Sequence, residues 1–186
     1  MEQKWANKLN NDEFSLIEND WYPLIKKSAI DKIKAQMVES GEHLQSLFPH
    51  ESFKISAGER LQDLPYLVLD FPKINNPNFE FVCRTLFWWG RGIQFQVIFQ
   101  GTQADVYEKI LKLAEPTDYI LIGTNLWQND LSNEDFKPLS QLSEINQVEV
   151  VSKTYFKMVR FNPIESKENL FDGLSEFFLQ FKGFDH

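Results

Sequence analysis

Two apolar stretches joined by a glycine-rich turn constrain the fold of this chain more than any other feature. Residues 79–89 and 93–100 are rich in Phe, Val, Ile and Trp, and Gly90, Arg91 and Gly92 separate them. This pattern is a strong signal for a β-hairpin. Because successive side chains of a strand point to opposite faces of the sheet, the alternation also assigns each residue to a face.

The length of the turn decides which faces of the two strands meet. If residues 90–92 form a three-residue loop, Trp89 opposes Ile93 and the apolar rows of the two strands coincide. A two-residue loop would place Arg84 among apolar side chains, where an unpaired guanidinium is costly. We therefore expect the three-residue loop, with Gly92 in the left-handed conformation of a bulge.

The remaining elements predict an α+β fold in one domain, residues 1–186. A long amphipathic helix is expected from Pro23 to Phe48, because its apolar residues recur every three or four positions. Gly41 within it marks either a close contact with the sheet or a break. Further strands are expected near residues 53–57, 66–71, 119–124 and 148–161, and further helices begin at Thr102 and Ser166.

The order of these elements favours an antiparallel sheet. Strands that follow one another along the chain are typical of α+β folds rather than of doubly wound parallel sheets. We expect five to six mainly antiparallel strands, covered on one face by the N- and C-terminal helices. Residues 127–146 are polar and contain Pro138, and they are interpreted as a long loop with a helical turn.

Composition places the protein in the cytoplasm and argues against two classes of partner. The formal net charge is −8, and basic residues occur only in short groups such as Lys26 and Lys27. Nucleic-acid binding usually needs a clustered basic face, and anionic membranes attract basic segments, so neither partner is expected. The single cysteine cannot form an intramolecular disulfide, and the chain has no signal-peptide core and no apolar run of about 20 residues.

Metal, cofactor and nucleophile sites have little support in the sequence. His43 and His50 would lie about 10 Å apart on one helix, and His186 is the last residue. No glycine-rich phosphate loop or metal-ligand spacing occurs, so we expect no metal and no cofactor. Cys83 falls on the apolar face of the first hairpin strand, where a cysteine behaves as a small buried hydrophobe.

The opposite face of the hairpin carries the candidate ligand-binding residues. Alternation and the neighbouring strand place six polar or aromatic side chains there: Tyr66, Asp70, Arg84, Trp88, Gln94 and Gln96. An arginine can form a fork to a carboxylate or phosphate, and aromatic walls with a few amides are typical of small-molecule pockets. The alternative is structural, with Arg84 paired to Asp70 or Glu80 and Trp88 covered by a helix or by residues 127–146.

These residues support three functional hypotheses. The first is a non-enzymatic module that binds a small ligand or a protein through this polar-aromatic face. The second is a small cytoplasmic enzyme with an Asp70/Arg84 site, in which Asp70 ends its strand and has a raised pKa. The third is an acidic protein that neutralises a basic partner. Trp88 and Trp89 could also form a hairpin tip that docks on a partner, and the chain is expected to be a monomer or a homodimer.

Two segments carry a resemblance to known proteins. The run from Leu64 to Pro72 reads LPYLVLDFP, and the run from Arg84 to Gly90 reads RTLFWWG. Together they resemble a pattern in a group of uncharacterised bacterial proteins of this size. The resemblance covers the central part of the chain. It implies a bacterial cytoplasmic protein, and it assigns no activity and no catalytic residue.

Overall fold

The computed structural model describes residues 9–75, 77–101, 104–143, 149–150, 153–164 and 170–182. The chain divides into two compact units, Met1–Ala35 and Gln36–His186, and each is described by itself. The expectation of one domain over residues 1–186 stays a prediction. The strand expected over residues 148–161 begins only at Tyr155, and residues 149–150 are helical. The strand expected over residues 119–124 ends at Leu121. Thr102 and Ser166, the expected first residues of two helices, lie outside the described residues.

The N-terminal unit is helical. Helix α1 (Asn11–Glu18) begins with a reciprocal capping box, in which Oδ1 of Asn10 accepts from the Glu13 backbone N–H at 2.9 Å. Oε2 of Glu13 in turn accepts from the Asn10 backbone N–H at 2.6 Å. Helix α2 (Trp21–Leu47) begins in this unit and continues into the second, so the long helix expected from residue 23 is present.

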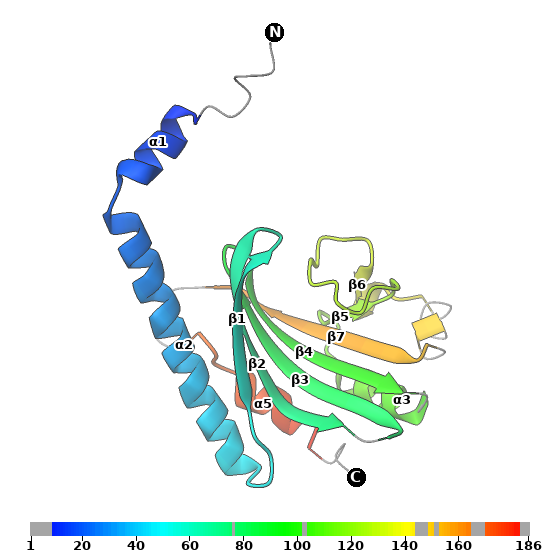
Figure 1. Ribbon diagram of the computed structural model, residues 1–186. Helices are drawn as coiled ribbons and strands as arrows, with labels where there is room; N and C mark the ends of the chain where they lie inside the picture. Colours follow the sequence, from blue (N-terminus) through cyan, green and yellow to red (C-terminus); the bar gives the residue numbers. More distant parts are fainter. Residues whose placement is uncertain are drawn as a thin grey trace. The chain divides into compact units, whose positions relative to one another are not determined.

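The second unit contains a seven-stranded antiparallel sheet, so the α+β class is confirmed (Figure 1). The strand order is β1-β2-β3-β4-β7-β5-β6, and every pairing is antiparallel. The strands are β1 (Lys54–Leu61), β2 (Leu64–Asn75), β3 (Phe79–Trp88), β4 (Gly92–Gly101), β5 (Tyr119–Leu121), β6 (Phe136–Pro138) and β7 (Tyr155–Asn162).

The expected count of five to six strands was too low because β6 lies within residues 127–146. A three-residue strand has no alternation of its own, so sequence patterning cannot reveal it. Turn η2 (Leu139–Gln141) is the helical turn expected in this segment. A second correction concerns β2, which does not end at Asp70 but continues through a register shift to Asn75.

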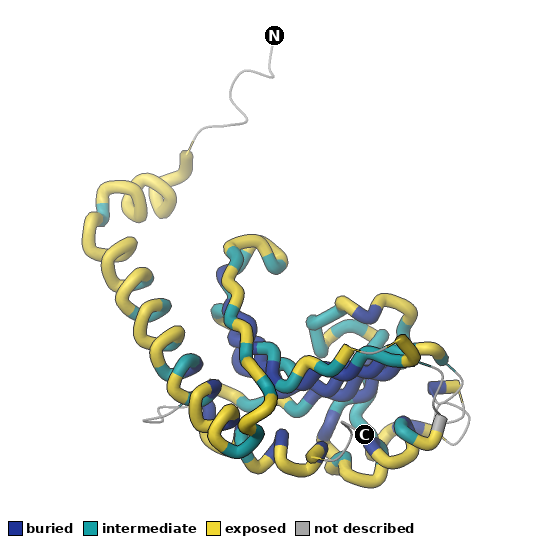
Figure 2. Tube along the Cα trace, turned by 60° about the horizontal axis from the view of Figure 1, so that its bottom comes forward, coloured by how far each residue is buried: buried dark blue, intermediate teal, exposed yellow. Residues whose placement is uncertain are grey.

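One face of the sheet packs against helices α3 (Ala104–Leu113) and α5 (Leu174–Leu179) through aromatic rings. The ring of Phe177 in α5 lies 5.7 Å from that of Phe95, and the ring of Tyr107 in α3 lies 5.3 Å from that of Phe99. Figure 2 shows buried residues concentrated along the central strands. Cys83 is buried on this face, as predicted. These rings form the main core.

The second half of α2 also contributes buried residues. Met37, Gly41 and Leu44 are buried, and a Cβ atom at Gly41 would lie 2.8 Å from the ring of Phe53. The helix continues through Gly41, so the glycine marks a close contact and not a break. The wider expectation that the N- and C-terminal helices together cover one face of the sheet stays a prediction.

The hairpin turn differs from the prediction by one position. Trp88 pairs with Gly92, so the three-residue loop consists of residues 89–91 and not 90–92. The backbone N–H of Arg91 donates to the Trp88 carbonyl at 2.9 Å and closes this turn. Gly92 is the first residue of β4, and the ring of Phe161 occupies the space where its Cβ atom would lie. The pairing moves by two residues, so every side chain keeps its predicted face.

The two glycines of this hairpin provide a matched test. Both have positive φ, 71° at Gly90 and 104° at Gly92, but only at Gly92 would a Cβ atom meet another group, the Phe161 ring at 2.6 Å. We expect Gly92→Ala to lower the free energy of unfolding by about 1–2 kcal/mol more than Gly90→Ala, because overpacking adds to the shared backbone strain. Urea unfolding of both variants measures this difference, and equal losses would contradict the packing of Phe161 on Gly92.

Candidate functional site

The face of the sheet opposite α3 and α5 carries the six predicted site residues. Across the strands, Asp70 pairs with Arg84, and Arg84 pairs with Gln96, so the three form one row. Tyr66 pairs with Trp88 in a second row nearer the hairpin turn. Gln94 lies between the two rows on β4 and pairs with Leu86. The register therefore brings all six predicted residues to one face.

Trp88 and Tyr66 belong to an apolar cluster on this face and not to an open surface. The cluster contains Val68, Leu86 and Trp88, with Leu61, Leu64 and Tyr66 packed against it. The indole N–H of Trp88 donates to the Leu61 carbonyl at 3.0 Å, and the side chain is buried. Trp88 therefore does not face a partner at the hairpin tip, because its indole is buried and already has a hydrogen-bond partner. Trp89 is partly buried, and docking of the tip through it stays a prediction.

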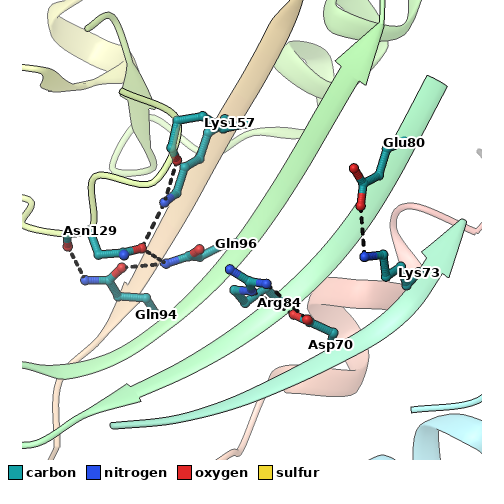
Figure 3. Close-up of polar contacts among 9 residues, drawn as sticks. Asp70, Lys73, Glu80, Arg84, Gln94, Gln96, Asn129 and Lys157 are labelled. Atoms are coloured by element: carbon teal, nitrogen blue, oxygen red, sulfur yellow. Dashed lines mark hydrogen bonds and ion pairs between the residues drawn. The ribbon is translucent and has the colours of Figure 1, made fainter. Parts of the chain in front are cut away.

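Arg84 and Asp70 form a two-pronged ion pair. Nε and Nη2 of Arg84 donate to the two Asp70 oxygens at 2.7 and 3.0 Å (Figure 3). Their side chains are 21% and 14% exposed. The guanidinium also lies 5.4 Å from the ring of Trp127, which is 59% exposed. Of the two partners considered for Arg84, Asp70 is the one observed, and Glu80 pairs with Lys73 at 3.0 Å.

A segment of the long loop lies against this face through amide groups. The side-chain amide of Gln94 donates to the Asn129 carbonyl at 2.8 Å, and that of Gln96 donates to Oδ1 of Asn129 at 3.0 Å. The Gln96 amide also donates to Oε1 of Gln94 at 2.8 Å (Figure 3). Within the part of the chain that the structure describes, Oε1 of Gln96 is buried without a hydrogen-bond partner. The two glutamines thus position Asn129 and keep one acceptor open.

Lys157 completes this network, and sequence reasoning missed it. It lies in the middle of β7, is 1% exposed, and donates to the Gln128 carbonyl at 2.6 Å and to Oδ1 of Asn129 at 2.9 Å. A third acceptor, the Leu126 carbonyl, lies at 3.3 Å. Burial, with a smaller contribution from the charge of Arg84, lowers the pKa of Lys157 to about 7. An available signal was a lysine between two apolar residues, Phe156 and Met158, within a strand.

A cavity of about 270 Å³ lies at the hairpin end of this face. Its apolar walls are Trp88, Tyr119, Leu131 and Phe161, and its polar lining is Arg91, Gln94, Asn129, Asp130 and Ser132. Apolar walls with a small number of convergent polar groups are typical of small-molecule sites. Of the six predicted residues, Trp88 and Gln94 line this cavity, and the other four do not.

The cavity contains two groups of opposite charge. The Arg91 guanidinium lies 5.7 Å from the ring of Trp88. Oδ1 of Asp130 accepts from the Ser132 hydroxyl at 2.6 Å, and Oδ2 accepts from the Gln62 amide at 3.3 Å. The Ser132 hydrogen bonds, the Gln62 bond and the positive charge of Arg91 together hold the pKa of Asp130 below its usual value. The lining of the cavity therefore presents the carboxylate of Asp130 and the guanidinium of Arg91, two groups of opposite charge.

Other kinds of site have no support among the described residues. In this part of the chain, no three His, Cys, Asp or Glu side chains gather closely enough to bind a metal ion. Burial raises the pKa of Cys83 well above its usual value, so the thiol stays protonated at neutral pH. His186 lies outside the described residues. No described helix combines the length and the apolar character that crossing a membrane requires.

Comparison with protein-family models, with curated proteins and with solved structures finds no match to this chain.

Proposed function

We propose that this protein is a non-enzymatic binding module whose cavity takes a small zwitterionic ligand of the amino-acid class. The observation that carries the proposal is the cavity itself, in which Arg91 and Asp130 line the same space as the apolar walls. A ligand carboxylate would receive a fork from the Arg91 guanidinium, and a ligand ammonium would donate to Asp130. At about 270 Å³ the cavity is near the lower end of ligand pockets, which favours a small molecule.

The polar-aromatic face contributes Trp88 and Gln94 to this cavity and positions part of its lining. Gln94 and Gln96 hold Asn129, and Asn129 lines the cavity beside Asp130. Arg84 and Asp70 form an ion pair through Nε and Nη2 of Arg84, and no residue that the structure describes accepts a hydrogen bond from Nη1. With Trp127 beside it, that nitrogen offers a second place for a planar anion. After the cavity, this is the position on the polar-aromatic face that the geometry favours most.

The two rival functions have less support. An enzyme with an Asp70/Arg84 site needs a carboxylate that can take up or release a proton, and both oxygens of Asp70 already accept from Arg84. An acidic partner-neutralising protein needs carboxylates gathered on one face. A cytoplasmic location, and membership of the group of uncharacterised bacterial proteins that the sequence resembles, belong to the same proposal.

Ligand binding is tested by thermal unfolding in the presence of amino acids and of simple carboxylates. A ligand that binds only the folded state raises the melting temperature. Arg91→Ala should weaken the binding of a hit by about tenfold or more, because a hydrogen bond to a charged group contributes about 1.5–3 kcal/mol. Arg60, an exposed arginine on β1, provides the control variant Arg60→Ala, which should keep the shift.

The variant Arg84→Ala distinguishes the two positions on this face. A shift that Arg84→Ala abolishes and Arg91→Ala preserves would place the ligand beside Trp127 instead of in the cavity. If no zwitterion or carboxylate at millimolar concentration shifts the wild-type melting temperature, the proposal of a small zwitterionic ligand fails, and a protein partner takes its place.

A further inference from the structure

The N-terminal unit exposes large apolar side chains on its two helices. Six of them are between 52% and 67% exposed: Phe14, Leu16, Ile17, Trp21, Leu24 and Ile25. In α2, residues 21, 24, 25 and 28 follow the spacing of one helical face. By the same helical period, that face lies opposite the face of Ile30, Ile33 and Met37. Large apolar side chains exposed close together in sequence are a mark of a binding surface.

Charge changes sign along this unit. Between residues 9 and 20 every charged side chain is acidic: Asp12, Glu13, Glu18 and Asp20. Between residues 26 and 34, four lysines, at positions 26, 27, 32 and 34, accompany the single acidic residue Asp31. Phe14, Leu16 and Ile17 are interspersed with the acidic residues, and Trp21, Leu24 and Ile25 lie between Asp20 and the lysines. The unit is therefore acidic and apolar in α1, apolar at the start of α2, and basic over residues 26–34.

We propose that this surface binds the same surface of a second copy of the chain, with the two N-terminal units antiparallel. In a two-fold interface, residue i of one copy meets residue j of the other and the reverse. An antiparallel pair places the acidic α1 of each copy against the lysines of the other copy's α2, and brings the apolar side chains of the two copies together. A parallel pair would place like charges together. An anionic membrane would attract only the lysine end, because α1 would be repelled.

The oligomeric state of the full chain tests this proposal by light scattering and sedimentation equilibrium. The wild type should be a dimer, and Ile17→Asp combined with Leu24→Asp should shift it to a monomer, because both positions become charged within the apolar contact. The matched control is Leu179→Asp, since Leu179 is also an exposed leucine on a helix, at 40%, in the second unit. Circular dichroism checks that each variant keeps its helices and sheet.

A charge exchange tests the antiparallel arrangement directly. Asp12→Lys with Glu18→Lys makes one variant, and Lys32→Glu with Lys34→Glu makes the other. The dimer of each variant alone should have a dissociation constant at least tenfold higher than that of the wild-type dimer. An equimolar mixture should form mixed dimers with close to the affinity of the wild type, because the opposed charges again match.

Three outcomes would overturn the proposal. The first is a wild type that stays monomeric at every concentration tested. The second is dissociation by Leu179→Asp to the same extent as by the N-terminal variants. The third is a monomer that binds vesicles containing phosphatidylglycerol through these helices, which would assign the surface to a membrane. None of the substituted residues lines the cavity, so these results are independent of the ligand proposal.

Discussion

Raising the pH from 7 to 9 should increase the contribution of Lys157 to the free energy of unfolding by about 2 kcal/mol. The pKa of this lysine is about 7 in the folded protein and 10.5 in the unfolded chain. Between these values the unfolded chain binds a proton that the folded protein does not bind, so stability rises with pH. The contribution is smallest below pH 7, where the buried amine is charged, and is complete only above pH 10.5. Each pKa unit corresponds to about 1.4 kcal/mol.

The measurement is a series of urea unfolding curves for the wild type and Lys157→Met between pH 7 and 9. Subtracting the two pH profiles removes the groups that both proteins share, including Lys153, whose pKa burial also lowers. The range stops at pH 9 because Cys83 and Tyr107 act in the opposite sense at higher pH, since burial raises their pKa values. The exposed Lys109 provides the control variant Lys109→Met, which should leave the wild-type slope unchanged.

Parallel pH profiles for the wild type and Lys157→Met would show that Lys157 keeps its proton in the folded protein. Its three oxygen acceptors, among them Asn129 Oδ1, would then offset the cost of burying the charge. In that case the ammonium, and not the neutral amine, holds the loop segment from Leu126 to Asn129 on the sheet.

Replacing Phe177 with alanine should lower the free energy of unfolding by about 3–5 kcal/mol, the usual range for a buried phenylalanine. This ring is 1% exposed and lies within 5.7 Å, centroid to centroid, of the rings of Phe95, Phe178 and Phe181. The Arg160 guanidinium lies 5.0 Å from the centroid of the Phe177 ring. The variant therefore removes the ring contact between Phe177 of α5 and Phe95 of the sheet.

Leu179→Ala is the matched control for Phe177→Ala because Leu179 lies on the same helix and is 40% exposed. We expect a loss of less than about 1 kcal/mol from this control, since surface substitutions usually change stability by about 0.5 kcal/mol. Thermal and urea unfolding measure both variants. Similar small losses in the two would show that α5 does not cover the sheet, and the prediction that the C-terminal helix covers this face would be wrong.

Alternation along β3 and β4 was sufficient to place side chains on the correct faces of the sheet. Arg84 and Gln96 share a face because each strand alternates strictly, and this result survived a turn placed one residue too late. The ring of Phe161, which is about 70 residues away in sequence, packs where a Cβ of Gly92 would be, and the pattern of the hairpin does not contain this contact. Local pattern predicts faces well because it is local, and it cannot predict a contact made by a distant strand.

The candidate site shows the same division between local and distant information. Trp88 and Gln94 were predicted from the hairpin and do line the cavity. The sequence placed Arg91 in the hairpin turn. Its proximity to Asp130 depends on where the loop that carries Asp130 packs against the sheet. Lys157 became part of the site through three oxygens of that loop. Irregular segments have no periodicity, so the sequence does not reveal which side chains they cover.

The position of β7 has a consequence for the order in which the chain can fold. This strand is the last of the seven in sequence, yet it lies between β4 and β5 in the sheet. Until it joins, no strand pairing among the described residues links β1–β4 to the pair β5–β6, and β4 and β5 keep open edges. Side-chain hydrogen bonds, such as those of Gln94 and Gln96 to Asn129, are among the contacts that then remain between the two parts. Because a ribosome releases the N-terminal strands first, the nascent protein cannot join these parts into one sheet until residues 155–162 have emerged. A chain shortened before Tyr155 would keep two unpaired edges, which are templates for aggregation.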